Sequence, residues 1–213
     1  MDNKKVKTYG LVLGIVLFVL LVAGFTYAAL TWRSNNILIN GSTECLDIDY
    51  TKTNDISGDE LLLLDKNKII SNNKITITKG MVLSGVTAKI KSTCTIEGYL
   101  TLNLKVTSVN SAFTSSGNST GALNYVLVSY DPATYSTIDV TTLNGVSFDI
   151  ISTGTITSTS TIKLKDEQLS KDSTTAYMVI FYIDGDLAQN DAANATSNFK
   201  GTLEASITQG TLK

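Results

Sequence analysis

Tyr99-Leu-Thr-Leu-Asn-Leu-Lys-Val-Thr107 alternates apolar and polar residues from Leu100 to its end. Successive side chains of a strand point to opposite faces of the sheet, so residues of one kind share a face. This pattern predicts a strand with one buried and one exposed face. The apolar face comprises Leu100, Leu102, Leu104 and Val106, and the polar face comprises Thr101, Asn103 and Lys105.

The same alternation recurs on both sides of this strand. It is clear in Phe199–Thr208 and weaker in Thr87–Ser92, whereas Ala176–Ile183 is apolar on both faces and is predicted to be a central strand of the core. Polar turn clusters separate the strands, and Gly58–Asp65 favours a short helical turn. We therefore predict an all-β fold, a single antiparallel β-sandwich. The other predicted strands are Asn36–Asn40, Cys45–Tyr50, Lys74–Thr78, Ala122–Tyr130, Val146–Ser152 and Thr155–Lys165.

The N-terminus predicts export from the cytoplasm. Residues 8–32 carry no charge and follow a cluster of lysines at Lys4, Lys5 and Lys7. Such a stretch forms a hydrophobic helix, and the positive-inside rule places the rest of the chain outside the cytoplasm. Two interpretations fit: a signal peptide cleaved after Ala28, or an uncleaved anchor with its N-terminus inside and its C-terminus outside. We expect residues 1–32 to be this leader and residues 33–213 to be the extracellular sandwich, membrane-anchored or secreted.

The composition of the chain excludes or disfavours several classes of function. The formal net charge is −2 and no basic cluster follows the leader, which disfavours nucleic acid as a partner. The chain has no histidine, so a Ser-His-Asp triad and a histidine zinc site are excluded, and we expect no enzymatic activity. The two cysteines, Cys45 and Cys94, form either one disulfide or a pair of buried free thiols.

Three groups of residues are candidate binding sites, each with a plainer alternative. Asp184, Asp186 and Asp191 have the oxygen ligands of a calcium site, or simply belong to a solvated hairpin loop. A second acidic group is a polar strand face, a cation site or a glycosidase-type carboxylate pair. Tyrosines form either an exposed binding patch or part of the packed core. The second group contains Asp47, Asp49, Asp55, Asp59 and Glu60, and the third contains Tyr125, Tyr130, Tyr135, Tyr177 and Tyr182.

Two stretches resemble a known family. The end of the leader is Ala23-Gly-Phe-Thr-Tyr-Ala-Ala-Leu-Thr-Trp32, and the C-terminus has an aromatic-rich strand, a polar loop over Asp184–Asn198 and a final alternating strand. These are similar to the leader end and the closing hairpin of the TasA/camelysin family of Gram-positive matrix proteins, whose leaders are removed by a dedicated signal peptidase. Some relatives are described as metalloproteases, an activity that this histidine-free chain is not expected to share.

The resemblance implies a jelly-roll-like sandwich that assembles into extracellular fibres. The segment freed by leader cleavage, within Ala29–Asn40, would add as a strand to the next subunit. The alternative is that Asn36–Asn40 is the first strand of its own domain. We predict a cell-surface or matrix protein; the alternative is a membrane-anchored adhesin or glycan-binding module. The apolar residues of the donor segment are Leu30, Trp32, Ile37 and Ile39.

Overall fold

The structure, a computed structural model, describes residues 31–33, 46–51, 54–92, 97–188 and 199–209. The chain divides into two compact units, Met1–Trp32 and Arg33–Lys213. Strand β1 (Thr31–Arg33) begins in the first unit and ends in the second.

Most of the leader lies outside the described residues, and so does the predicted strand Asn36–Asn40. In the described ranges, no helix is both long and apolar enough to span a membrane.

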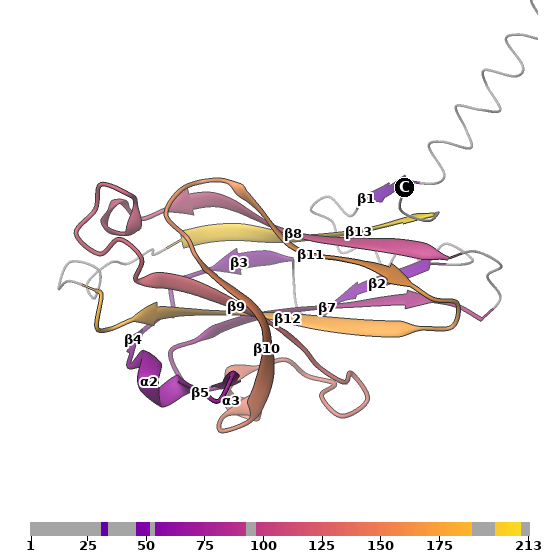
Figure 1. The fold of residues 1–213 in the computed structure, drawn as a ribbon, viewed down its shortest axis with the longest axis horizontal. Helices are drawn as coiled ribbons and strands as arrows, with labels where there is room; N and C mark the ends of the chain where they lie inside the picture. Colours follow the sequence, from indigo (N-terminus) through magenta and orange to yellow (C-terminus); the bar gives the residue numbers. More distant parts are fainter. Residues whose placement is uncertain (1–30, 34–45, 52–53, 93–96, 189–198, 210–213) are drawn as a thin grey trace, which may run out of the picture. The chain divides into compact units, whose positions relative to one another are not determined.

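The second unit contains two packed β-sheets, as the alternation predicted (Figure 1). The larger sheet has eight described strands, in the order β2-β7-β12-β9-β10-β6-β5, with β4 beside β12. Its pairs are antiparallel except for the two-residue pairing of β4 with β12. These strands are β2 (Leu46–Tyr50), β4 (Leu63–Leu64), β5 (Ile70–Ser71), β6 (Lys74–Thr76), β7 (Val82–Ile90), β9 (Leu123–Ser129), β10 (Ser147–Thr155) and β12 (Thr174–Asp184).

The smaller sheet is built on two long strands, β8 (Gly98–Val109) and β13 (Phe199–Gln209), which pair antiparallel along their length. On its other side β8 pairs with β11 (Thr161–Leu169), and β13 pairs with the short β3 (Asp55–Ser57). All four of these strands pair antiparallel. The two sheets confirm an antiparallel β-sandwich.

The first core lies between the two sheets. The apolar face predicted for the opening stretch is buried there: Leu100, Leu102 and Leu104 are fully inaccessible. They pack with the inward residues of β13 and with those of β12 from the facing sheet, and the rings of Phe181 and Phe199 lie 4.9 Å apart. Burial of alternate residues on both sheets is the main stabilising contribution to such a sandwich.

A second core lies on the outer face of the larger sheet. Alternate residues of β12 point there, which explains why this strand is apolar on both faces and confirms it as a central strand. The covering layer includes the β5–β6 hairpin and the short helices α2 (Lys66–Ile69) and α3 (Val140–Leu143), seen beneath the sheet in Figure 1. This third layer was not predicted from the sequence. The β12 residues in the second core are Ala176, Met178, Ile180 and Tyr182.

Three predicted features are wrong. One strand over Thr155–Lys165 is in fact the end of β10, a turn and the start of β11. The helical turn follows the predicted segment rather than occupying it, because the Asp65 carboxylate caps α2 by accepting the Asn67 N–H at 3.0 Å. The closing hairpin is absent, because β12 and β13 belong to different sheets.

Candidate functional site

Several predicted site residues lie outside the described residues. They are both cysteines of the predicted disulfide, Cys45 and Cys94; Asp191 of the predicted calcium site; and Leu30, Ile37 and Ile39 of the predicted donor strand. Trp32 lies in β1, where the backbone alone is described. These predictions stay predictions.

Asp184 and Asp186 form a tight turn after β12. The Asp184 side chain is buried and accepts the Asp186 N–H at 3.1 Å, and the Asp184 carbonyl accepts the N–H groups of Leu187 and Ala188. These hydrogen bonds satisfy the Asp184 carboxylate and carbonyl within the turn itself, and Asp186 contributes its N–H to them. No group of three or more Asp, Glu, Cys or His side chains that could hold a metal occurs within the described ranges.

The second acidic group is divided between two surfaces. Asp47 and Asp49 lie on the outward face of β2 in the larger sheet, whereas Asp55 lies on β3 in the smaller sheet. Glu60 follows β3 and accompanies Asp55 in a separate groove. The grouping inferred from sequence is therefore wrong, because the chain changes sheets between β2 and β3.

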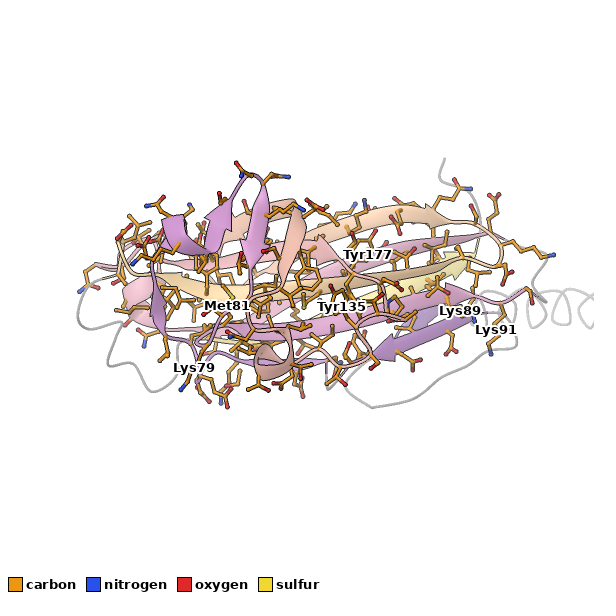
Figure 2. All side chains as sticks on the ribbon, turned by 90° about the horizontal axis from the view of Figure 1, so that it is seen from below. Lys79, Met81, Lys89, Lys91, Tyr135 and Tyr177 are labelled. Atoms are coloured by element: carbon orange, nitrogen blue, oxygen red, sulfur yellow. The ribbon has the colours of Figure 1, made fainter. Side chains whose placement is uncertain are left out.

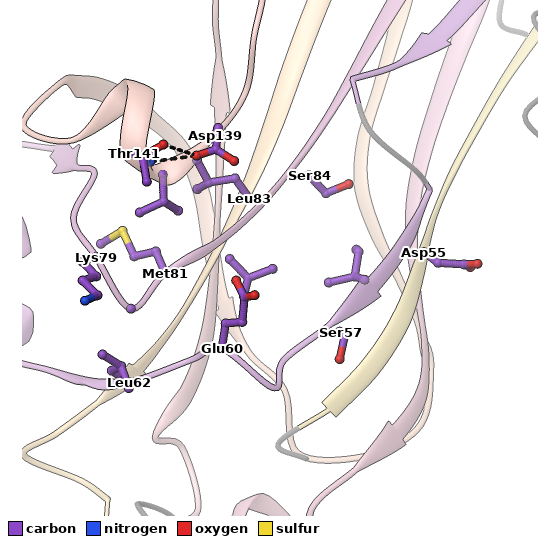
Figure 3. A pocket seen from close by; sticks show the side chains of 14 residues that line it. Asp55, Ser57, Glu60, Leu62, Lys79, Met81, Leu83, Ser84, Asp139 and Thr141 are labelled. Atoms are coloured by element: carbon purple, nitrogen blue, oxygen red, sulfur yellow. Dashed lines mark hydrogen bonds between the residues drawn. The ribbon is translucent and has the colours of Figure 1, made fainter. Parts of the chain in front are cut away.

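The acidic groove, as we name it, has a volume of about 570 Å³ and lies beside β3, the start of β7 and the start of α3 (Figure 3). The Ser84 side chain lines it and is 6% exposed, and its Oγ has no hydrogen-bond partner in the described part of the chain. Leu62, 52% exposed, contributes apolar surface. The residues that line the groove are Asp55, Ile56, Ser57, Glu60, Leu62, Lys79, Gly80, Met81, Val82, Leu83, Ser84, Asp139, Val140 and Thr141.

Two of the three carboxylates in the acidic groove have structural partners. Asp139 caps α3 by accepting the Thr141 N–H at 2.9 Å and the Thr141 hydroxyl at 2.6 Å. Asp55 accepts the Thr202 hydroxyl at 3.2 Å. Three carboxylates against Lys79 as the single lining cation give the groove a negative potential, which favours a cationic ligand.

The tyrosine groove, as we name it, has a volume of about 340 Å³ and lies on the outer face of the larger sheet. Its floor comes from β2 and β7 and its wall from the segment after β9, where Figure 2 labels Tyr135. Burial, and then the neighbouring Asp47 carboxylate, raise the pKa of Asp49 above its ordinary value. The lining residues are Asp49, Tyr50, Thr51, Thr87, Tyr130, Pro132, Tyr135 and Ser136.

The structure separates the five tyrosines that were grouped from sequence. Tyr177 and Tyr182 are buried on opposite faces of β12, Tyr177 in the first core and Tyr182 in the second. The Tyr177 hydroxyl donates to Glu167 Oε2 at 2.5 Å; burial first, and then this hydrogen bond, raise the pKa of Tyr177. Only Tyr130 and Tyr135 share a groove, so a single five-tyrosine patch is wrong.

The smaller sheet has one outer edge at β11, and this edge is irregular and charged. A β-bulge shifts its pairing between Lys163 and Lys165. Lys165 and Glu167 stand opposite inward-facing residues of β8, and Glu167 Oε2 lies 3.7 Å from Lys165 Nζ. Bulges and inward-pointing charges are devices that stop another strand from adding to an edge.

The opposite side of this sheet is the outer edge of β13, which we define as Leu203–Gln209. Strand β3 pairs there with β13 as far as Thr202, and β1 (Thr31–Arg33) is also a neighbour of β13 in this sheet. The Leu203 N–H donates to the Asn54 carbonyl at 2.7 Å and the Ala205 N–H to the Tyr50 hydroxyl at 2.9 Å. Alternate residues direct their N–H groups to the same side, so Ile207 and Gln209 point theirs outward too.

No family model and no curated protein matches this chain. The TasA/camelysin resemblance therefore rests on the residues quoted for it.

The described residues thus offer two grooves for recognition, and a strand edge at β13 where β1 and β3 already pair. The strand edge offers backbone hydrogen bonds, the acidic groove offers negative charge with apolar surface, and the tyrosine groove offers hydroxyls beside aromatic rings. Tyr50 contributes to the strand edge and to the tyrosine groove and was not selected from the sequence. Its place in the alternating segment Cys45–Tyr50 could have been read as an inward position, but its bond to β13 depends on the packing of the two sheets.

Proposed function

We propose that this chain is a non-enzymatic protein of the bacterial cell surface or extracellular matrix that assembles by strand addition. In this proposal the hydrophobic N-terminal helix carries the chain out of the cytoplasm, and the exported part is a jelly-roll-like sandwich. The supporting observation is the contrast between the two edges of the smaller sheet. The β11 edge carries a bulge and inward charges, whereas the outer edge of β13 is regular from Gly201 onward.

An incoming strand would pair with the outward N–H and C=O groups of β13. Ala205 and Ile207 are buried, so the side chains there already serve the first core, and the backbone provides the recognition. The Tyr50 hydroxyl would be displaced or bridged at Ala205. The donor in this proposal is the segment Ala29–Asn40 of the next subunit, freed by cleavage after Ala28. In the structure β1 (Thr31–Arg33) of this segment neighbours β13 of its own chain, so the incoming segment would take its place.

The test is assembly of protein that begins at Ala29, followed by electron microscopy and light scattering over a range of concentrations. We expect fibres that lengthen with concentration, and we expect none from protein lacking residues 1–40. An excess of a synthetic peptide with the sequence of residues 29–40 should block elongation by occupying the edge, and a scrambled peptide should not. Fibres formed equally well without residues 1–40 would overturn the proposal.

A matched pair of variants tests whether the incoming strand pairs with the end of β13. Gln209→Pro removes one outward N–H without touching a hydrogen bond to β8, whereas Gln209→Ala removes the same side chain and keeps the N–H. We expect the proline variant to elongate more slowly than the alanine variant. Equal rates for the two variants would exclude this end of β13 as the site of addition.

The second candidate function is a membrane-anchored binding module, which the acidic groove favours. Its buried Ser84 hydroxyl, which has no partner among the described residues, and its excess of carboxylates suit a ligand that brings both a hydrogen-bonding group and a positive charge. A monomer that never assembles, but whose melting temperature rises with added calcium or sugars, would favour this function.

A further inference from the structure

The tyrosine groove is rich in oxygen atoms, and no cationic side chain is among the described residues that line it. Seven of its eight lining residues carry a side-chain hydroxyl or carboxylate, and the eighth is Pro132. The Tyr50 hydroxyl is already engaged with the Ala205 N–H, so the remaining polar groups come from Asp49, three aliphatic hydroxyls and two phenols. Hydroxyls both donate and accept hydrogen bonds, while a carboxylate only accepts.

The groove is held in shape by its own hydrogen bonds. Tyr130 is 9% exposed, and its hydroxyl lies 3.3 Å from the hydroxyls of both Thr51, which follows β2, and Thr87 in β7. The ring of Tyr135 packs edge-on against Phe148, with ring centroids 5.3 Å apart. These contacts fix both rings before any ligand arrives, which lowers the entropic cost of binding.

The wall of the groove is also fixed. The Asp131 carboxylate accepts the Ala133 N–H at 2.9 Å and the Thr134 hydroxyl at 2.7 Å, and the Asp131 carbonyl accepts the Tyr135 N–H at 2.9 Å. This turn carries Pro132 and presents Tyr135 and Ser136 to the groove.

We propose that the tyrosine groove binds a neutral saccharide unit of an extracellular polysaccharide. A sugar ring has a C–H face that suits an aromatic ring and a rim of hydroxyls that suits mixed donors and acceptors. Asp49 accepts from sugar hydroxyls and Tyr135 supplies the aromatic surface. An anionic ligand is disfavoured, because the one charged lining residue is a carboxylate. This site shares Tyr50 with the β13 edge but takes a saccharide instead of a strand, so it goes beyond the proposed assembly.

The experiment is titration calorimetry with the full chain in a zwitterionic detergent that has no sugar head group. The probes are neutral hexasaccharides of glucose, of N-acetylglucosamine and of galactose. We expect at least one to bind, with Tyr135→Ala weakening the affinity by about tenfold or more and Tyr135→Phe retaining it. Asp49→Asn should also weaken binding, because the side chain loses its charged acceptor.

The matched control is Asp149→Asn, which makes the same change at an exposed carboxylate of β10 that pairs with Lys74 and lines neither groove, and it should leave the affinity unchanged. Should Tyr135→Ala fail to fold because it loses the Phe148 contact, the exposed Asp49→Asn still decides the question. Three results would overturn the proposal: no hexasaccharide binds, Asp49→Asn binds as tightly as the unaltered chain, or polygalacturonate binds more tightly than every neutral probe. Since fibre assembly is scored separately by microscopy, loss of either property leaves the other testable.

Discussion

The side chain of Tyr182 lies in the second core and is 2% exposed. Burial, and then the nearby Asp184, raise its pKa to about 12. In the unfolded chain a tyrosine titrates near pH 10, so between pH 10 and 12 the unfolded state loses this proton first. The stability that this proton contributes is present below pH 10 and is lost as the pH rises through 12, a loss on the order of 2 kcal/mol.

Replacement of this one hydroxyl checks the prediction. Tyr182→Phe keeps the ring and removes the ionisable group, so its free energy of unfolding should fall less steeply between pH 10 and 12. Urea unfolding followed by circular dichroism measures this difference. Tyr177, whose pKa is also raised, is present in both proteins and cancels in the comparison. Parallel curves for the two proteins would contradict the prediction.

At the level of single residues, the sequence predicted which side chains are buried better than what they contact. Alternation placed Leu100 and Ile207 correctly on inward faces, because burial on a strand follows a two-residue period. Alternation could not pair the Tyr50 hydroxyl with the Ala205 N–H, or Asp49 with Tyr130 in one groove. Those contacts depend on how the sheets and the outer layer pack, which local periodicity does not encode.

Among the elements, the hairpin of β5 and β6 is the clearest case of turn chemistry. Asn72 and Asn73 both have positive φ, 50° and 59°, as a two-residue turn of type I′ requires. The Asn73 side-chain amide also donates to the Ile150 carbonyl at 3.2 Å, which ties the hairpin to β10. We expect Asn73→Ala to destabilise the protein by about 1–2 kcal/mol, because alanine tolerates positive φ poorly and makes no such bond.

The control for this hairpin is Asn73→Gly. Glycine adopts positive φ freely but lacks the amide, so its loss of stability should lie between zero and that of Asn73→Ala. The free energy of unfolding in urea distinguishes the three proteins. An alanine variant as stable as the glycine variant would mean that backbone conformation at this turn contributes nothing.

Long strands were predictable and short ones were not. The predicted strands Cys45–Tyr50, Ala122–Tyr130 and Phe199–Thr208 are confirmed within two residues at each end, because each is long enough to show alternation. Strands of two or three residues, such as β3 and β4, are too short to show a repeated alternation in the sequence. They form because a neighbouring strand offers hydrogen bonds. The continuous β-formers from Thr155 to Lys165 concealed the turn between β10 and β11, because that turn contains neither glycine nor proline.

At the scale of the second unit, part of the surface of each sheet is covered by neither core. The outer layer covers much of one face of the larger sheet, and the tyrosine groove lies on that same face, beside Pro132. The smaller sheet has one irregular, charged edge at β11, and on its other side β1 and β3 pair with the regular strand β13. In the proposed function, assembly at β13 and saccharide binding in the tyrosine groove would be two activities of a single subunit.

In the proposed function the first unit carries the chain out of the cytoplasm, and the N-terminus of the natural protein tests this. Intact mass and N-terminal sequencing of chains recovered separately from membranes and medium should give a start at Ala29 in the medium, because assembly needs the freed segment. Alkylation without reductant should leave Cys45 and Cys94 unmodified if they form the predicted disulfide. Leu46, next to Cys45, pairs with Ile90, four residues before Cys94, across β2 and β7. An intact Met1 found in membranes alone would instead make the protein a tethered domain, and assembly through Ala29–Asn40 would be excluded.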